Sequence, residues 1–266
     1  MANYRKPYRI KKKKSILKNW FFWSGILILI IFSAVFYLVF FHSFFQIKVI
    51  KISGNVKVST ESLENLLNQK INRQILFSSS QSIFLADFDE IKKEILESFP
   101  QVAETNLKRK FPDSLLLEIK ERKPAAIFYQ TDKNFFVDEE GIVFESFDLD
   151  LTSQDLITFK KQAEEEVNLG RKIIEREQLS KILEAESKLK NELKILVKEM
   201  LMVSEVRFDA KTLEGFEVYF NFNEDLGWQL TKLKAVLEEE VLPEKRKDLE
   251  YIDVRFGKFA PCIYRD

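Results

Sequence analysis

The side chains that could perform chemistry are few in this chain of 266 residues. His42 is the only imidazole and Cys262 the only thiol, so an intramolecular disulfide is excluded. His42 directly follows a long apolar segment, a position that excludes a Ser-His-Asp arrangement, and no second histidine or cysteine could complete a metal site with it. Catalysis of hydrolysis or transfer needs a nucleophile with a base, a metal, or two acids held across a site. The sequence therefore predicts no metal site and no nucleophilic catalysis.

Neighbouring acids occur in three runs, Glu139-Glu140, Glu164-Glu165-Glu166 and Glu238-Glu239-Glu240. A glycosidase places two carboxylates across its substrate, but consecutive acids on turns and helices are typical of solvated faces. The seven glycines are scattered and form no phosphate-binding loop, so no cofactor is expected. We predict that the chain is not an enzyme, and a membrane-tethered enzyme is the least favoured of the alternatives.

The C-terminal segment is better suited to binding. Pro261 cannot donate a backbone hydrogen bond, which favours an edge strand, and an edge offers unpaired N–H and C=O groups to a partner strand. Arg255 could pair with an acid of that partner. The bulky side chains that we expect to contact a partner are Phe256, Phe259 and Tyr264. The alternative for Phe256 is a core position, because it alternates with Ile252 and Val254.

The N-terminal part predicts a membrane anchor. Residues 1–41 contain eight of the 42 basic side chains and no acid, which leaves 34 basic against 42 acidic side chains in the remainder. Residues 20–41 carry no charge and would extend about 33 Å as a helix, enough to span a bilayer. The run is longer than the apolar core of a cleaved signal peptide, so we expect it to be retained. A nucleic-acid patch is the alternative reading of the lysines.

The position of the basic residues also predicts orientation. They all precede the span, so residues 1–19 should be a cytoplasmic tail and the chain beyond it should face outward. That outward part is long enough for two domains.

Residues 44–123 are predicted to form a small α+β domain. An apolar strand ends at Gly54-Asn55, and Ser59 precedes a helix whose apolar face contains Leu63, Leu66, Leu67 and Ile71. Asp87 and Glu90 have capping-box spacing for a second helix that ends before Pro100. A hairpin follows, with a turn at residues 111–114 and a second arm that buries Leu115, Leu117 and Ile119. The serine-rich residues 78–82 are predicted to be an exposed loop.

Residues 124–266 are predicted to form a mostly β domain. Residues 133–145 have the pattern of a hairpin with Gly141 at its turn. A Glu/Lys-rich stretch around residues 179–190 predicts a helix packed across a sheet, with a coiled-coil partner site as the alternative. Leu226, Leu230, Leu233 and Leu237 then define one face of a final helix.

Several of these segments resemble the FtsQ/DivIB family of bacterial cell-division proteins. The stretches ISGNVKVS (52–59) and FPQVAETNLKRKFPDSLLLEIKERKPAAIF (99–128) resemble its POTRA domain, and residues 133–145, 226–241 and 249–265 resemble its second domain. The resemblance implies an α+β protein with a single N-terminal transmembrane helix, a POTRA domain of order β-α-α-β-β, and a mostly β C-terminal domain with a few helices.

The resemblance also implies function. Members of the family are non-catalytic scaffolds of the division complex in the cytoplasmic membrane at the septum, where they regulate septal peptidoglycan synthesis. Their terminal strands bind an FtsB-like protein paired with an FtsL-like protein, and the POTRA domain would contact other division proteins. Arg255, Phe256 and Gly257 match the family's arginine-aromatic strand, and Tyr264 falls at the aromatic beyond it. No nucleic acid or small-molecule substrate is expected.

The alternative function is that of a POTRA-type chaperone or transport-associated protein, which would capture polypeptides by β-strand addition.

Overall fold

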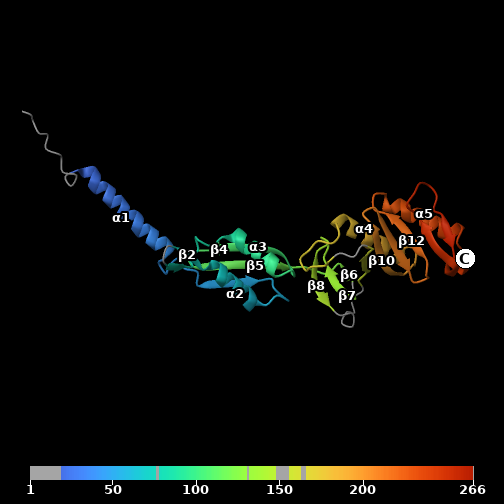
Figure 1. Ribbon diagram of the computed structural model, residues 1–266, viewed down its shortest axis with the longest axis horizontal. Helices are drawn as coiled ribbons and strands as arrows, with labels where there is room; N and C mark the ends of the chain where they lie inside the picture. Colours follow the sequence, from blue (N-terminus) through green and yellow to red (C-terminus); the bar gives the residue numbers. More distant parts are fainter. Residues whose placement is uncertain (1–18, 76–77, 131, 148–155, 163–165, 266) are drawn as a thin grey trace, which may run out of the picture. The chain divides into compact units, whose positions relative to one another are not determined.

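The computed structural model describes residues 19–75, 78–130, 132–147, 156–162 and 166–265 (Figure 1). The predicted basic tail lies outside these residues except for Asn19. The chain forms two compact units. The first contains the N-terminal helix, residues 61–91 and a hairpin tip at residues 107–117, and the second contains residues 54–60, residues 92–106 and everything from Glu118 onward.

The N-terminal helix α1 (Trp20–Phe40) is apolar on every side, and none of its described side chains is buried. Its N-terminus is capped by Asn19, whose side-chain oxygen accepts from the Phe21 amide at 3.1 Å. Twenty-one residues extend about 32 Å, close to the thickness of a bilayer's hydrocarbon core. Within the described residues α1 is the one helix long and apolar enough to cross a membrane.

The first domain after α1 has the predicted element order with one addition. Its elements are β1 (Val49–Ser53), α2 (Thr60–Ile71), β2 (Arg73–Ile75), β3 (Ser78–Ser80), α3 (Phe88–Ser98), β4 (Val102–Lys110) and β5 (Ser114–Glu121). Strands β1, β5 and β4 form a sheet in that order, which confirms the β-α-α-β-β pattern, and β2 and β3 pair as a separate two-stranded ribbon.

The buried faces of this domain agree with the hydrophobic spacing except at Leu66, which is only half-buried. Leu63, Leu67 and Ile71 of α2 are buried, as are alternate residues of β5. The buried residues of α3 and β5 are Ile91, Ile95, Leu115, Leu117 and Ile119. The peptide bond between Phe111 and Pro112, in the turn between β4 and β5, is cis.

The start of α3 is capped only in part as predicted. The Asp87 carboxylate accepts from the Asp89 and Glu90 amides at 3.1 and 3.2 Å, as an N-cap should. The Glu90 carboxylate, however, pairs with Arg73 of β2 and with Lys70 of α2. The second half of the expected capping box is therefore replaced by ion pairs with β2 and α2.

The serine-rich segment is exposed only in part. Ser78, Ser79 and Gln81 are exposed, as the composition predicts, but residues 78–80 form strand β3 instead of a loop. Ser80 and Ser82 are both buried. The Ser82 hydroxyl donates to the Val39 carbonyl of α1 at 2.8 Å, and the Ser80 hydroxyl donates to the Phe40 carbonyl. The last carbonyls of a helix have no hydrogen-bond donor within the helix. The two serine hydroxyls are the donors for these carbonyls of α1.

Glu121 at the end of β5 holds the loop between β1 and α2. Its carboxylate accepts from the backbone amides of Val56, Lys57 and Val58 at 2.7 to 3.0 Å. Burial of the carboxylate raises its pKa, but the three amides outweigh this effect, and the pKa of Glu121 lies below its ordinary value.

The second domain contains one mixed sheet of nine strands in the order β14-β13-β12-β11-β10-β9-β6-β7-β8. Its strands are β6 (Ala126–Gln130), β7 (Lys133–Val137), β8 (Val143–Phe147), β9 (Thr158–Lys161), β10 (Val197–Ser204), β11 (Arg207–Thr212), β12 (Glu217–Asn221), β13 (Leu249–Asp253) and β14 (Cys262–Tyr264). The predicted hairpin is formed by β7 and β8, with Gly141 at φ +80° in its turn.

Two helices cover one face of this sheet. Helix α4 (Arg176–Asn191) contacts β10, and α5 (Leu226–Glu239) contacts β12. Buried residues from both helices and from the strands join in one hydrophobic core, which includes Leu179, Ile182, Phe208, Phe220 and Leu233. Both helices predicted from leucine spacing are therefore confirmed.

Strand β9 (Thr158–Lys161) is not predicted by the sequence pattern. This strand is four residues long and pairs parallel with β6 on one side and with β10 on the other. It is too short for periodicity to identify.

A comparison of Gly141 and Gly170 distinguishes the cost of a positive φ from the cost of a steric clash. Gly141 (φ +80°) would place an added Cβ 1.9 Å from the Ile174 carbonyl oxygen, whereas at Gly170 (φ +86°) no atom lies closer than 4.0 Å. We expect Gly170→Ala to destabilise the protein by about 1–2 kcal/mol through φ alone. Gly141→Ala should cost about 1–3 kcal/mol more because the backbone must move. Thermal unfolding of the detergent-solubilised chain measures both, and equal losses would contradict the clash.

Glu121→Gln should lower the free energy of unfolding by about 1.5–3 kcal/mol at pH 7, because a charged acceptor is lost from three backbone amides. A lowered folded-state pKa stabilises the protein above the unfolded-state pKa of about 4.3, and this contribution disappears as the pH falls through the folded-state pKa. The difference between wild type and variant, measured by denaturant titration, should therefore shrink on acidification. A difference that does not change with pH would disprove the assignment.

Candidate functional site at the C-terminal sheet edge

Strand β14 forms one end of the nine-stranded sheet. It pairs antiparallel with β13, with Ile263 opposite Tyr251 and Cys262 opposite Ile252. In the described part of the chain no strand lies on its other side. The side chains of Ile263 and Tyr264 are both exposed. An edge of this kind offers backbone donors and acceptors to an added strand.

The segment between β13 and β14 is held by α5 through buried Lys232. The Lys232 ammonium donates to the carbonyls of Val254, Phe256 and Gly257 at 2.6, 3.2 and 3.3 Å. The indole N–H of Trp228 donates to the Gly257 carbonyl at 3.4 Å. Burial lowers the pKa of Lys232, since desolvation disfavours its charge. The segment thus has a defined path although it is neither helix nor strand.

Phe256 and Phe259 project from this segment into solvent, with 61% and 84% of their surface exposed. Ile252 and Val254 are buried, as their alternation predicts, but β13 ends at Asp253 and the chain turns away before Phe256. The alternative that placed Phe256 in the core is therefore wrong. Gly257 has φ +49°, and an added Cβ there would meet nothing within 4 Å.

Arg255 lies on the sheet face opposite the helices, where its charge is already compensated. Its guanidinium donates to both Asp253 carboxylate oxygens, at 2.9 and 2.7 Å, and lies over the rings of Tyr219 and Phe256. Burial of the Asp253 carboxylate raises its pKa, but the hydrogen bonds from Arg255 outweigh this effect. The pKa of Asp253 therefore lies below its ordinary value. A partner acid would have to compete with Asp253 for Arg255.

A row of cross-strand neighbours surrounds this pair. Asp209, Tyr219 and Asp253 are aligned by register on β11, β12 and β13. Arg207 donates to both oxygens of Asp209 at 2.8 Å and lies 3.9 Å from the centre of the Tyr219 ring. Tyr219 in turn stacks on Tyr251. These ion pairs and stacked rings form one connected cluster, which reaches the exposed Phe256 through Arg255.

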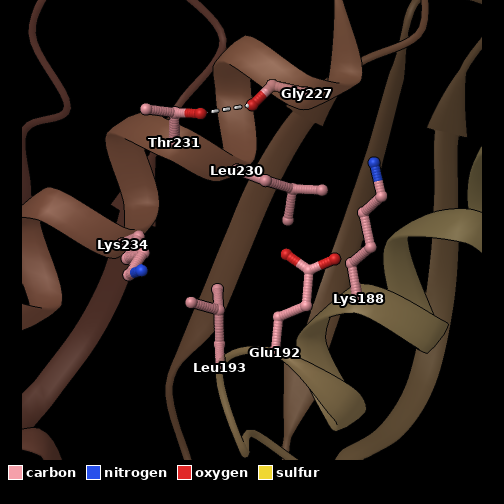
Figure 2. A pocket seen from close by; sticks show the side chains of 7 residues that line it. All are labelled: Lys188, Glu192, Leu193, Gly227, Leu230, Thr231 and Lys234. Carbon is pink, nitrogen blue, oxygen red and sulfur yellow. Dashed lines mark hydrogen bonds between the residues drawn. The ribbon is translucent and has the colours of Figure 1, made fainter.

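Two cavities flank α5. One of about 230 Å³ lies between α5 and the segment that carries Phe259 and is lined by Trp228 and Lys232. The other, of about 250 Å³, lies between α4 and α5 (Figure 2). Figure 2 shows its mixed lining, with Leu230 and Lys234 from α5 and Glu192 at the end of α4. The Thr231 hydroxyl there donates to the Gly227 carbonyl at 2.8 Å.

His42 and Cys262 belong to different compact units. His42 is exposed just after α1, and its Nδ1 accepts from the Phe44 amide at 3.2 Å. Cys262 lies half-buried in β14, where burial raises the pKa of its thiol. No three His, Cys, Asp or Glu side chains among the described residues could hold a metal ion.

Lys232, Trp228 and Tyr219 were not identified from the sequence. Lys232 lies next to Leu233, at the border of the predicted leucine face. That position was the only sign in the sequence that its side chain is buried. Tyr219 had no local signal, because its partners come from β11, β13 and the segment that follows β13.

Comparison with known proteins gives a consistent assignment. Residues 126–255 match the family described as "Cell division protein FtsQ/DivIB, C-terminal", and residues 45–122 match "POTRA domain, FtsQ-type". A cell division protein DivIB from Clostridium tetani is 25% identical over 236 residues, which are 85% of this chain and 82% of the relative. A DivIB from Clostridium botulinum is 24% identical over 263 residues, 93% and 91% of the two chains. A cell division protein FtsQ from Novosphingobium aromaticivorans is 30% identical over 104 residues, 38% and 32%.

Lys232→Met should loosen the segment between β13 and β14, because three carbonyls lose their donor while the apolar stem is retained. We expect amide hydrogen exchange of residues 254–258 to accelerate roughly tenfold, as loss of about 1.4 kcal/mol of local stability implies. Lys234→Met is the control, since Lys234 lies exposed on the same helix. Equal exchange in both variants would show that Lys232 does not hold the segment.

Proposed function

Because the chain belongs to the FtsQ/DivIB family of cell division proteins, we propose that it is a non-catalytic scaffold of the division complex. It recruits and links FtsB-like and FtsL-like bitopic partners at the septum and thereby regulates septal peptidoglycan synthesis. The proposal divides the chain into a cytoplasmic tail (1–19), a transmembrane helix (20–41), a POTRA domain (44–123) and an FtsQ-type β domain (124–266).

The observation that carries this proposal is the sheet edge at β14. An FtsB-like segment adds a strand to β14 and forms main-chain hydrogen bonds with it. Phe256, Phe259 and Tyr264 supply apolar contacts beside that strand, and interfaces draw most of their energy from a few such aromatic anchors. Gly257 lets the chain turn between the anchors.

The anchor gives the scaffold its location. Helix α1 has the length of a single membrane span, and the basic residues before it keep the N-terminus in the cytoplasm. Both outer domains then face the periplasm or the exterior, where division partners with a single span expose their own outer segments. The POTRA domain provides a further surface for other division proteins.

Strand addition at β14 would also serve a chaperone that captures translocating polypeptides. The two functions differ in selectivity, because main-chain pairing alone accepts many extended peptides whereas the aromatic anchors require matching pockets. An unrelated extended peptide is therefore the discriminating ligand in the binding experiment.

The combined Phe256→Ser and Tyr264→Ser variant should lose the FtsB-like partner. Each aromatic anchor at such an interface contributes about 2 kcal/mol, so each substitution should weaken binding roughly thirtyfold. The measurement is co-purification of the full-length detergent-solubilised chain with the FtsB-like protein, followed by titration.

Leu169→Ser is the matched control, since Leu169 is 44% exposed and its neighbour Gly170 bonds to β8 at the opposite end of the sheet. Retained binding by a folded double variant would refute the edge assignment. Equal binding of an unrelated extended peptide would favour polypeptide capture.

A further inference from the structure

The end of α1 is tied to the first outer domain by side chains whose role the scaffold proposal does not use. Besides the Ser80 and Ser82 hydroxyls, the Gln46 side-chain amide donates to the Phe40 carbonyl at 3.0 Å. The Gln46 side-chain oxygen accepts from the Gln81 amide at 2.7 Å. Each residue that contacts Val39 or Phe40 must therefore lie at the same depth as the end of the helix.

That depth follows from the length of α1. Its 21 residues extend about 32 Å, and a hydrocarbon core is about 30 Å thick. Trp20 near one end and Tyr37 near the other are the side chains that prefer the two membrane–water interfaces. Ser80 and Ser82 then lie at the boundary between the hydrocarbon and the headgroups.

A row of phenylalanines begins at this boundary and leads to the tip of the β4–β5 hairpin. Phe44, Phe45, Phe84 and Phe111 follow one another with ring centroids 5.0, 5.2 and 5.6 Å apart. Phe84 is 43% exposed and Phe111 58%, and Phe44 is exposed as well. Exposed apolar side chains in a contiguous row mark a surface that binds something.

The hairpin tip is held rigidly beside this row. Arg109 donates to the carbonyls of Ile83 and Ala86, both at 2.8 Å, and lies 4.1 Å from the centre of the Phe88 ring. Its neighbours Lys108 and Lys110 are exposed at the tip. Basic side chains around inserted aromatic rings match the headgroups of anionic lipids.

We propose that Phe44, Phe84 and Phe111 form a lipid-binding surface that inserts into the outer leaflet at the headgroup level, with Lys110 beside lipid phosphates. The surface holds the hairpin tip at the membrane, so that the start of the POTRA domain lies on the bilayer. This inference rests on the proposed role of α1 as the membrane anchor.

A lipid surface suits the row better than a protein does because the row is continuous with the end of α1. A protein partner would have to displace lipid around the span to reach Phe44, which lies four residues beyond Phe40. The lipid is present as soon as α1 is inserted.

The test uses spin labels on single cysteines in the full-length Cys262→Ser chain, reconstituted in nanodiscs of phosphatidylethanolamine and phosphatidylglycerol. Labels replace exposed side chains at Phe111, Phe84, Leu29 and Val56 in separate variants, so folding should be retained. Accessibility to oxygen, which concentrates in lipid, is compared with accessibility to a water-soluble nickel chelate. Val56, in the loop between β1 and α2, serves as the aqueous control and Leu29 in α1 as the lipid control.

We expect the labels at residues 29, 84 and 111 to be accessible to oxygen and shielded from nickel, and the label at residue 56 to show the reverse. Lys110→Glu should shift the label at residue 111 toward water by a factor of about five in phosphatidylglycerol nanodiscs and less in neutral ones. Phe84→Trp should preserve the insertion measured at residue 111.

Three results would overturn the inference in distinguishable ways. A lipid-embedded residue 29 with a water-exposed residue 111 would refute the lipid surface while leaving the anchor intact. A residue 111 that is aqueous in nanodiscs but cross-links to another protein in cells would assign the row to a protein partner. A water-exposed residue 29 would refute the anchor and the lipid surface together.

Discussion

The nine-stranded sheet depends on the pairing of a four-residue strand. Strand β9 lies between β6 and β10, parallel to both, and so joins the three strands β6, β7 and β8 to the five strands that end at β14. Phe159 at its centre is fully buried and packs 5.1 Å from the ring of Phe128. Without β9, the backbone groups of β6 and β10 would face each other unpaired in the interior, which a folded protein rarely tolerates. The C-terminal edge therefore relies on a strand far from it in sequence.

Helix α5 connects that sheet to the candidate site. Its leucine face packs in the core, while Lys232 and Trp228 lie where the helix passes the segment after β13. The same helix thus contributes to burial and to the shape of the exposed segment. Since a buried ammonium with three carbonyl acceptors is costly to desolvate and costly to leave unpaired, the segment can adopt few other paths. The aromatic side chains on it are presented by a preorganised backbone.

Local periodicity predicted most helices and the hairpins, because the apolar residues of α2, α3, α4 and α5 recur on one face. It failed where the partner is distant. Ser80 and Ser82 have the composition of a solvated loop, but their acceptors lie on α1, about 40 residues away. Phe256 continues the alternation of β13, yet the strand ends three residues earlier. At the candidate site the exposed aromatic residues could be predicted from composition. The ion pair between Arg255 and Asp253 could be identified only from the structure.

The two arginines on the open sheet face each have an internal counter-ion, Asp209 for Arg207 and Asp253 for Arg255. Such a surface has little net charge to project beyond a Debye length, so it cannot steer a partner from a distance. The rate of encounter must then come from another source. For a chain confined to a membrane, that source is the high local concentration of other proteins confined to the same two-dimensional surface. In the proposed scaffold, the edge of the sheet selects among partners that the membrane has already brought near.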